Sequence, residues 1–222
     1  KKMLMSKTYQ QQSVVSNKLY QKDPHNLLLA RSSSYRLPAE TIRDNALKIS
    51  GLLNSKFGGP SVKPYQPKGL WKEKNNFSVP LYEYEESQGE ELYRRGIYTF
   101  IKRTSPPPNM LTFDATSREV CTVKRNITST PLQALVLMND PQFFEASRVF
   151  AEKIIKSSVL LEDQIKFGFR SSTGRLPKEE EVDILVNLFF NFSAFIDLSA
   201  ISSSFKVSSL SRIFLTPLIV IP

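Results

Sequence analysis

The stretch TSTPLQALVLMNDPQFFEASRVFAEKII, residues 128–155, carries the clearest structural signal in this chain of 222 residues. Thr130 and Pro131 form a typical helix start, because proline at the first helical position lacks only an N–H that would have no partner there. Asp140 and Pro141 repeat this signal further along the stretch. The segment therefore predicts two consecutive helices that meet at an Asn-Asp-Pro corner.

Apolar residues follow the start signal in both expected helices, as in amphipathic helices. They are Leu132, Leu135, Val136 and Met138 in the first helix, and Phe143, Phe144, Ala146, Val149, Phe150 and Ile154 in the second. Gln133 stands three residues after Thr130. This spacing predicts a capping box at the start of the first helix.

Another helix is expected over residues 37–54, where apolar residues again follow a helical period. Pro38 and Glu40 suit its first turn, because proline needs no N–H partner there and a carboxylate complements the helix dipole. We expect this helix to end at Gly58 and Gly59.

Residues 160–190 predict two more helices, which Gly174 separates, and residues 92–101 fit either a helix or a strand. Residues 60–91 contain three closely spaced prolines and an acidic run, so they predict a long loop. The sequence as a whole predicts a mainly α fold, an irregular helical bundle with long connecting loops rich in proline and glycine.

Composition divides the chain into a helical domain over residues 1–186 and an atypical tail over residues 187–222. In the tail only Asp197, Lys206 and Arg212 are charged, while serine and phenylalanine dominate. A tail without helix caps or an amphipathic period folds poorly, so we expect it to be disordered or the product of a shifted reading frame. Its interrupted apolar runs predict no membrane span. The chain begins without the apolar run of a signal peptide, and we interpret it as a fragment of a longer multidomain protein.

The net charge of +9 favours acidic partners: a nucleic acid, an anionic glycan or a membrane surface. The excess is partly local, because residues 94–125 contain seven basic residues and two acids. Five arginines of this segment are candidate ligand-binding residues, although a solvated face is the alternative. They are Arg94, Arg95, Arg103, Arg118 and Arg125.

Little in the composition supports a metal or cofactor. With a single cysteine, Cys121, and a single histidine, His25, the chain can form neither an internal disulfide nor a haem attachment motif. A zinc site would need about four N, S or O ligands, and no Cys/His cluster supplies them. We therefore expect no metal and no cofactor in this chain, with Cys121 as a small buried side chain and His25 at the surface or at a helix cap.

The prolines of FGGPSVKPYQPKGLW, residues 57–71, argue against a phosphate-binding loop, because they remove backbone N–H groups and no Walker or dinucleotide motif is present. Tyr65 and Trp71 are candidate ligand contacts, since aromatic faces beside lysines can stack on sugar rings. The alternative is a stiff strap whose aromatic side chains pack on the helices.

Asp114 and Glu119 are the nominees for a catalytic role, in the segment FDATSREVCTVKR, residues 113–125. Two carboxylates beside arginines could serve acid–base chemistry, as in a glycosidase. The alternative is a structural salt-bridge network, and no catalytic residue is assigned.

Several long blocks resemble one known family. They are SKTYQQQS, DPHNLLLARSSSYRLPAETIRDNALKISGLL, GGPSVKPYQPKGLW, LYRRGIYTFIKRTSPPPNMLTFDATSREVCTVKRNITSTPLQALVLMNDPQFFEAS and GRLPKEEE, in this order. Together they resemble the planctomycete cytochrome-associated C-terminal domain of unknown function, a PSD-type domain, over about residues 3–186. Two departures are notable. Members commonly carry an acidic residue where Pro38 stands, and they continue with helical sequence where this chain has its tail.

The resemblance implies a mainly helical module of a large exported protein, in the cell envelope or outside the cell, with haem c bound only by an upstream module. Our hypothesis is a non-catalytic accessory module that contacts neighbouring domains of the parent protein or an acidic polysaccharide. The alternative is a hydrolase acting on polysaccharide. Nucleic-acid binding has only the charge in its favour, because no known nucleic-acid-binding motif is present.

Overall fold

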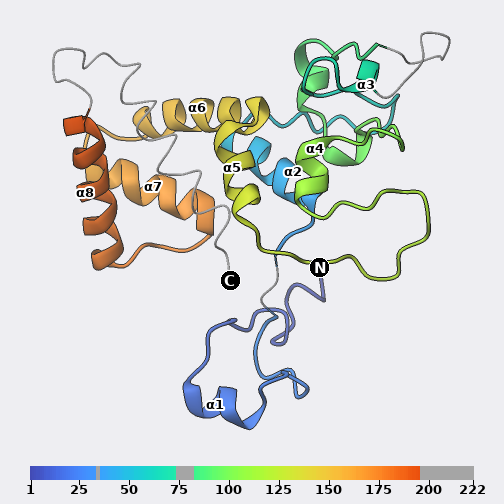
Figure 1. The fold of residues 1–222 in the computed structure, drawn as a ribbon. Helices are drawn as coiled ribbons and strands as arrows, with labels where there is room; N and C mark the ends of the chain where they lie inside the picture. Colours follow the sequence, from blue (N-terminus) through green and yellow to red (C-terminus); the bar gives the residue numbers. More distant parts are fainter. Residues whose placement is uncertain (34–35, 74–82, 196–222) are drawn as a thin grey trace. The chain divides into compact units, whose positions relative to one another are not determined.

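The computed structural model describes residues 1–33, 36–73 and 83–195, which fall into two compact units, Lys1–Arg36 and one that begins at Leu37. The described residues are mainly helical, and the β-structure among them consists of isolated bridges. The predicted mainly α fold with long loops is therefore confirmed. Its helices are α1 (Asn17–Lys22), α2 (Ala39–Ser50), α3 (Leu70–Glu73), α4 (Pro108–Thr112), α5 (Pro131–Asn139), α6 (Pro141–Ile155), α7 (Leu161–Thr173) and α8 (Glu179–Phe195), with 3₁₀ turns η1 (Gly89–Tyr93) and η2 (Gly96–Tyr98) (Figure 1).

The predicted pair of helices with a sharp corner is confirmed. Helix α5 begins at Pro131 and α6 begins at Pro141, directly after the corner (Figure 1). Asp140 is the N-cap of α6, because its Oδ1 accepts a hydrogen bond from the N–H of Gln142 at 3.0 Å. The cap satisfies one of the donors that every helix start leaves without a partner.

The predicted capping box at the start of α5 is wrong. Thr130 stands at the N-cap position, but its side chain makes no capping hydrogen bond. Gln133 is buried, and its Nε2 donates to the carbonyl oxygens of Thr112 at 3.0 Å and Thr128 at 3.1 Å. The amide therefore holds the end of the preceding loop against α4, which is a tertiary role that local spacing does not reveal.

Helix α2 packs against α6 and contributes to the first hydrophobic core. Ile42 and Leu47 are buried on one face of the helix, as its apolar period predicts. The helix ends at Gly51, earlier than the predicted Gly58 and Gly59. Gly51 has a φ of 94°, the left-handed conformation that glycine adopts at helix ends without a steric penalty. The buried members of the core are Ala39, Ile42, Ala46, Leu47, Met110, Phe113, Leu137, Phe143 and Ala146.

A second core joins the end of α6 to α7 and α8 (Figure 1). Phe150, Phe169 and Phe189 are buried there. Helix α8 runs to Phe195, so the first residues of the predicted tail are helical and one of them is a core residue. The predicted disorder or shifted frame concerns mainly residues 196–222, which lie outside the described residues, and the domain boundary at 186 stays a prediction.

Residues 92–101 form neither of the structures that their pattern allows. They contain the 3₁₀ turns η1 and η2 with an extended backbone between them. Val62 of the proline-rich strap pairs with this segment, donating to Tyr98 O and accepting from Phe100 N, both at 2.8 Å. The strap thus supplies the backbone hydrogen bonds that a helix would have supplied internally.

Two buried arginines connect these loops to the helices through side-chain hydrogen bonds. Arg43 of α2 donates to Gln142 Oε1 at 2.6 Å, to Arg94 O at 2.6 Å and to Leu92 O at 2.9 Å. Arg94 in turn donates to the carbonyl oxygens of Pro60 and Gly58. The loops are fixed to α2 and α6 through these cations, since a guanidinium offers five donors in a rigid plane.

The first unit, Lys1–Arg36, contains α1 and a loop that returns the chain toward residue 36. Helix α1 contributes no buried residue. Asp23, at the C-cap of α1, is buried, and both of its carboxylate oxygens accept backbone hydrogen bonds within the loop. Hydrogen bonds therefore organise the described part of this unit more than apolar packing does.

Candidate functional site

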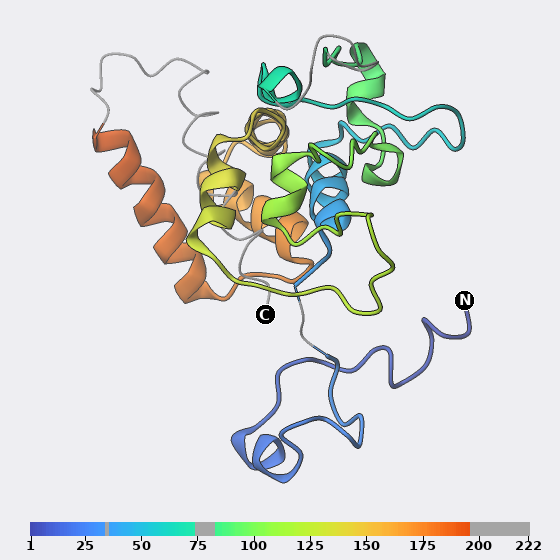
Figure 2. The same ribbon diagram turned by 45° about the vertical axis from the view of Figure 1, so that its right-hand side comes forward.

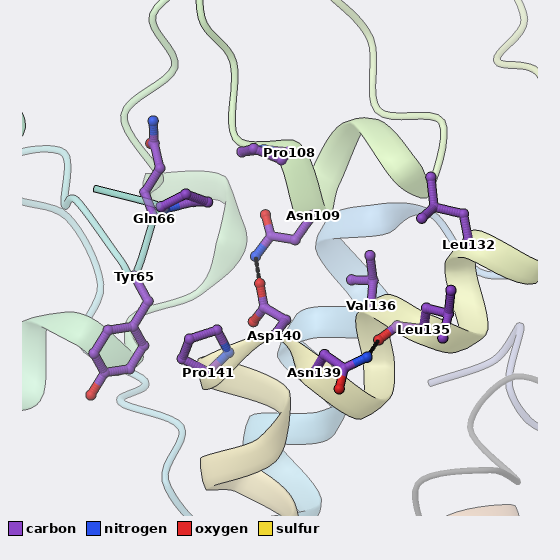
Figure 3. Close-up of a pocket in the computed structure, with 11 residues that line it drawn as sticks. Tyr65, Gln66, Pro108, Asn109, Leu132, Leu135, Val136, Asn139, Asp140 and Pro141 are labelled. Atoms are coloured by element: carbon purple, nitrogen blue, oxygen red, sulfur yellow. Dashed lines mark hydrogen bonds between the residues drawn. The ribbon is translucent and has the colours of Figure 1, made fainter. Parts of the chain in front are cut away.

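An open hollow of about 390 Å³ lies between the strap and helices α4, α5 and α6 (Figure 3). The volume is within the range of known small-ligand pockets, about 300–1,000 Å³. We call it the α5 groove, since α5 provides the largest part of its lining. Its lining residues are Tyr65, Gln66, Pro67, Pro108, Asn109, Leu132, Leu135, Val136, Asn139, Asp140 and Pro141.

The walls of the α5 groove are apolar. Leu132, Leu135 and Val136 line one side from α5 (Figure 3), and Tyr65 and Pro67 of the strap also line the groove. Both leucines remain exposed in spite of their size. An apolar surface that stays open to water in an otherwise folded protein is a candidate contact for a partner or ligand.

Several polar groups of the α5 groove are bonded to the protein itself, whereas the buried Nε2 of Gln66 has no hydrogen-bond partner among the described residues. Asn109 Nδ2 donates to Asp140 Oδ2 at 3.2 Å, and Asn109 Oδ1 accepts from the N–H of Met110 at 2.8 Å. Asn139 Nδ2 donates to the carbonyl oxygen of Leu135 at 3.0 Å. An occupant would therefore gain mostly from apolar contact, with few free donors or acceptors to meet.

Asp140 is the acidic group of the α5 groove. Burial raises its pKa, although hydrogen bonds from the backbone N–H groups of Gln142 and Phe143 and from Asn109 act in the opposite direction. A carboxyl group whose pKa is higher in the folded than in the unfolded chain holds its proton more tightly in the fold. Its contribution to stability therefore falls as the pH rises above the unfolded pKa of about 3.9.

We expect Asp140→Asn to be as stable as the wild type or slightly more stable at neutral pH, because asparagine is also a good N-cap and carries no charge to bury. This advantage should shrink as the pH falls toward about 4, where Asp140 itself becomes neutral. Urea unfolding across this range measures the difference, with Asp140→Ala as the variant that loses the cap. A loss of more than about 1 kcal/mol in Asp140→Asn at neutral pH would show that the charge itself stabilises α6.

Tyr65 is the predicted ligand-contact residue that the structure places in the α5 groove, where its ring lies beside Pro141 (Figure 3). Burial and the nearby carboxylate of Glu145 raise the pKa of Tyr65. Tyr93 donates a hydrogen bond to Glu145 Oε1 at 2.9 Å. Both hydroxyls therefore stay protonated at neutral pH, and neither offers a base.

Two other predicted ligand contacts are buried. Trp71 is 1% exposed, and Arg94 has a similarly small exposed fraction. Arg94 stacks on the ring of Tyr98, with 3.9 Å from its Cζ to the ring centroid, in addition to its hydrogen bonds to the strap. Trp71 and Arg94 therefore belong to the architecture of the strap and offer little surface to a ligand.

The remaining predicted arginines differ in their surroundings. Arg95 Nε lies 3.3 Å from Asp44 Oδ2, and Arg125 Nη1 lies 2.7 Å from Glu40 Oε2. Burial acts to raise the pKa of Glu40, but the hydrogen bond from Arg125, a backbone hydrogen bond and the charges of Arg125 and Arg118 together hold the pKa below its ordinary value. Arg103 and Arg118 are exposed. The structure does not gather the five arginines into the α5 groove.

The two carboxylates nominated for catalysis have different surroundings. Asp114 accepts hydrogen bonds from the N–H of Thr128 at 2.8 Å and from its hydroxyl at 2.9 Å. This contact closes the neck of the loop between α4 and α5, which reaches away from the helices (Figure 2). Glu119 is exposed on that loop. Cys121 lies on the same loop and is exposed, so the prediction that it is buried is wrong.

Most of the α5 groove was missed from the sequence, because Leu132 and Leu135 served only as evidence for a helix and Asp140 only as part of a helix-start signal. One signal could have found it. Helix α5 carries leucine at positions 132, 135 and 137, which one helix face cannot accommodate. Leu137 is buried and the other two are exposed, so the surplus apolar surface points to a contact beyond the core.

The fold and the groove define a mainly helical module with an open apolar cleft. Among the described residues, no helix is long and apolar enough to cross a bilayer, and no group of three or more His, Cys, Asp or Glu side chains could hold a metal ion. The model of the PSD1 family, described as a protein of unknown function (DUF1553), matches residues 1–189. The chain belongs to this DUF1553 family. No curated protein and no solved structure matches the chain.

Proposed function

We propose that the chain is a non-catalytic accessory module that uses the α5 groove to bind an apolar segment of a neighbouring domain in a longer protein. The observation that carries this proposal is the combination of open apolar walls with side chains of Asn109, Asp140 and Asn139 that are already bonded within the chain. Such a site favours an apolar occupant, because each Å² of apolar surface removed from water contributes about 25 cal/mol to the free energy of binding.

The family resemblance supplies the wider setting of this proposal. In this proposal, which the resemblance supports, the module is part of a large exported protein of planctomycetes or related bacteria, in the cell envelope or outside the cell, and follows a cytochrome c module that binds haem. In this proposal the haem belongs to the upstream module, and the present chain holds no cofactor. The role of the chain is then to position neighbouring domains.

An acidic polysaccharide is a weaker candidate partner at the predicted aromatic and arginine contacts. Trp71 and Arg94 are buried, while Arg95 and Arg125 are engaged by carboxylates of the same chain. A surface ion pair does not prevent binding, but it lowers the net charge available to an anionic polymer. A polysaccharide is therefore kept as a comparison in the binding experiment.

Hydrolysis also finds less support than binding. In a glycosidase the two carboxyl groups flank the bond that is cleaved. Asp114 is engaged by Thr128 at the neck of a loop, and Glu119 is exposed on that loop. Neither residue lines the α5 groove.

The test is peptide binding measured by methyl NMR and by fluorescence titration of a labelled peptide. The probe is an amphipathic helical peptide with leucines at three- and four-residue steps, and its scrambled sequence is the comparison. We expect the ordered peptide to shift the methyl signals of Leu132 and Leu135. Leu135→Glu should weaken binding at least about tenfold, because a charge replaces an apolar contact.

Leu111→Glu is the matched control, since Leu111 is an exposed leucine of α4 that does not line the groove. It should bind the peptide as the wild type does. Hyaluronan, as an anionic polysaccharide, should leave the groove methyl signals unchanged. Equal affinity of the wild type and Leu135→Glu, or equal binding of the scrambled peptide, would remove the α5 groove from the proposal.

A further inference from the structure

The loop of residues 23–31 in the first unit presents three consecutive leucines to solvent. Leu27 is 80% exposed and Leu28 is 82% exposed, and Leu29 is also exposed. Single exposed leucines are common on protein surfaces, but a contiguous apolar patch marks a contact site. We call this segment the leucine loop.

Hydrogen bonds between residues 23–31 fix the conformation of the leucine loop. The carboxylate of Asp23 accepts from the N–H of Leu27 at 2.9 Å and from the N–H of Leu28 at 2.8 Å. Arg31 Nη1 donates to the carbonyl oxygen of Asp23 at 2.9 Å, and Asn26 Nδ2 donates to the carbonyl oxygen of Arg31 at 2.7 Å. The polar side chains thus fold inward and leave the leucines outside.

The backbone of the leucine loop takes an uncommon conformation. Asn26 has a φ of 52° and Leu29 a φ of 53°, both in the left-handed region. This region is rare for a bulky residue such as leucine, and it persists only where surrounding contacts impose it. Strained backbone positions of this kind cluster at functional sites, so the conformation of Leu29 makes the leucine loop a candidate contact site.

The charge of the first unit adds a second property to the leucine loop. Residues 1–36 contain seven basic residues, and their single acid is Asp23. Because Asp23 is buried and engaged by the loop backbone, the charge on the surface of this unit is positive. Lys18 and Lys22 are exposed on α1, the helix that leads into the loop, together with Leu19 and Tyr20.

We infer that the leucine loop and α1 bind the surface of an anionic lipid bilayer, with Leu27 and Leu28 inserted among the lipids. Exposed leucines beside lysines fit an interface in which apolar side chains enter the acyl region and cations meet acidic headgroups. Leucine is under-represented among the energetic centres of protein–protein interfaces, which favours lipid over a protein partner. The lysines can keep their charges in the headgroup region while their stems lie along the apolar surface.

The first experiment measures flotation of the whole chain with vesicles. The vesicles are phosphatidylcholine alone, or phosphatidylcholine and phosphatidylglycerol in equal parts. We expect binding to the mixed vesicles and much weaker binding to the neutral ones. The double variant Leu27→Ser, Leu28→Ser should lose at least about tenfold in affinity, because two leucines no longer enter the apolar region.

The matched control is Leu160→Ser, Leu176→Ser, which removes two exposed leucines of the other unit. It should bind as the wild type does, and circular dichroism should show that both double variants remain folded. A lack of binding to mixed vesicles by the folded wild type would overturn the inference. Equal binding of Leu27→Ser, Leu28→Ser and the wild type would also overturn it, since charge alone would then account for adsorption.

The second experiment tests the cations. Lys18→Gln, Lys22→Gln should weaken binding to the mixed vesicles about tenfold or more at low salt, because each cation near an acidic surface contributes about fivefold. The effect should shrink above an ionic strength of about 0.1 M, where screening is strong. Lys156→Gln, Lys178→Gln, in the other unit, is the control. Equal losses in the two pairs would show unspecific adsorption and contradict a site on α1.

Discussion

Replacing Arg43 with methionine should lower the free energy of unfolding by about 3–5 kcal/mol, because it leaves a set of buried hydrogen-bond partners without a donor. Arg43 is buried in α2, and its guanidinium is the donor for Gln142 Oε1 and for the carbonyl oxygens of Leu92 and Arg94. Methionine fills much of the same volume, so the loss should come from the unmet polar groups.

Arg43 keeps its positive charge although it is buried. Burial lowers the pKa of Arg43 to about 10, while the carboxylates of Asp44 and Asp140 act to raise it. The guanidinium therefore remains protonated at neutral pH. Its charge is held by carbonyl oxygens and by Asp44, whose Oδ1 lies 3.6 Å from Arg43 Nη1. Arg43→Lys should keep the charge but lose the planar set of donors. We therefore expect its free energy of unfolding to lie between that of the wild type and that of Arg43→Met.

Urea unfolding followed by circular dichroism measures the effect of Arg43→Met. Arg148→Met is the matched control, since Arg148 is exposed on α6 and pairs with Glu152 at 3.2 Å, one helical turn away. An exposed pair of this kind contributes only about 0.3–0.5 kcal/mol. If Arg43→Met were no more destabilising than Arg148→Met, the hydrogen bonds of Arg43 would not stabilise the packing of the loops on the helices.

Local chemistry explains why α5 and α6 could be predicted from the sequence. The proline at each helix start and the Asp140 cap act through neighbours only a few residues away, and the structure shows both. The Gly51 helix end was missed although its cause is also local. Gly58 and Gly59 were a stronger glycine signal, but they belong to the strap, where both adopt a positive φ.

Long-range partners explain what could not be predicted. The buried position of Gln133 depends on Thr112, and that of Arg94 depends on Pro60 and Gly58. Nothing in the residues next to Gln133 or Arg94 encodes these contacts. A basic residue is usually exposed, so counting Arg94 as part of a charged surface was the natural interpretation, and only the fold shows that its donors face inward.

The candidate site was predicted only in part for the same reason. Tyr65, which was predicted as a ligand contact, lines the groove, whereas Leu132 and Leu135 had served only as evidence for a helix. Spacing identifies an apolar face but does not say whether another element of the chain covers it. The α5 groove exists because the strap passes at a distance from α5, and that separation is a property of the assembled fold.

Trp71 raises a related question, because an aromatic residue beside lysines suits both a ligand contact and a core. The structure places its ring 4.9 Å from that of Tyr84, edge to face, and 5.8 Å from that of Phe100. Lys102 Nζ lies 4.5 Å from the ring centroid. These contacts surround the indole, so its lysine neighbours serve as cation–π partners within the fold.

Trp71→Ala should therefore destabilise the second unit by about 3–5 kcal/mol, through lost burial and the cavity left behind. For a body of this size the melting temperature should fall by about 6–20 °C. Trp71→Phe keeps an aromatic ring and should cost distinctly less. Phe57→Ala is the matched control, since Phe57 is 93% exposed and its removal should change stability by less than about 0.5 kcal/mol. A Trp71→Ala variant that melts with the wild type would mean that the strap does not depend on the indole, and Trp71 would return to the candidates for ligand contact.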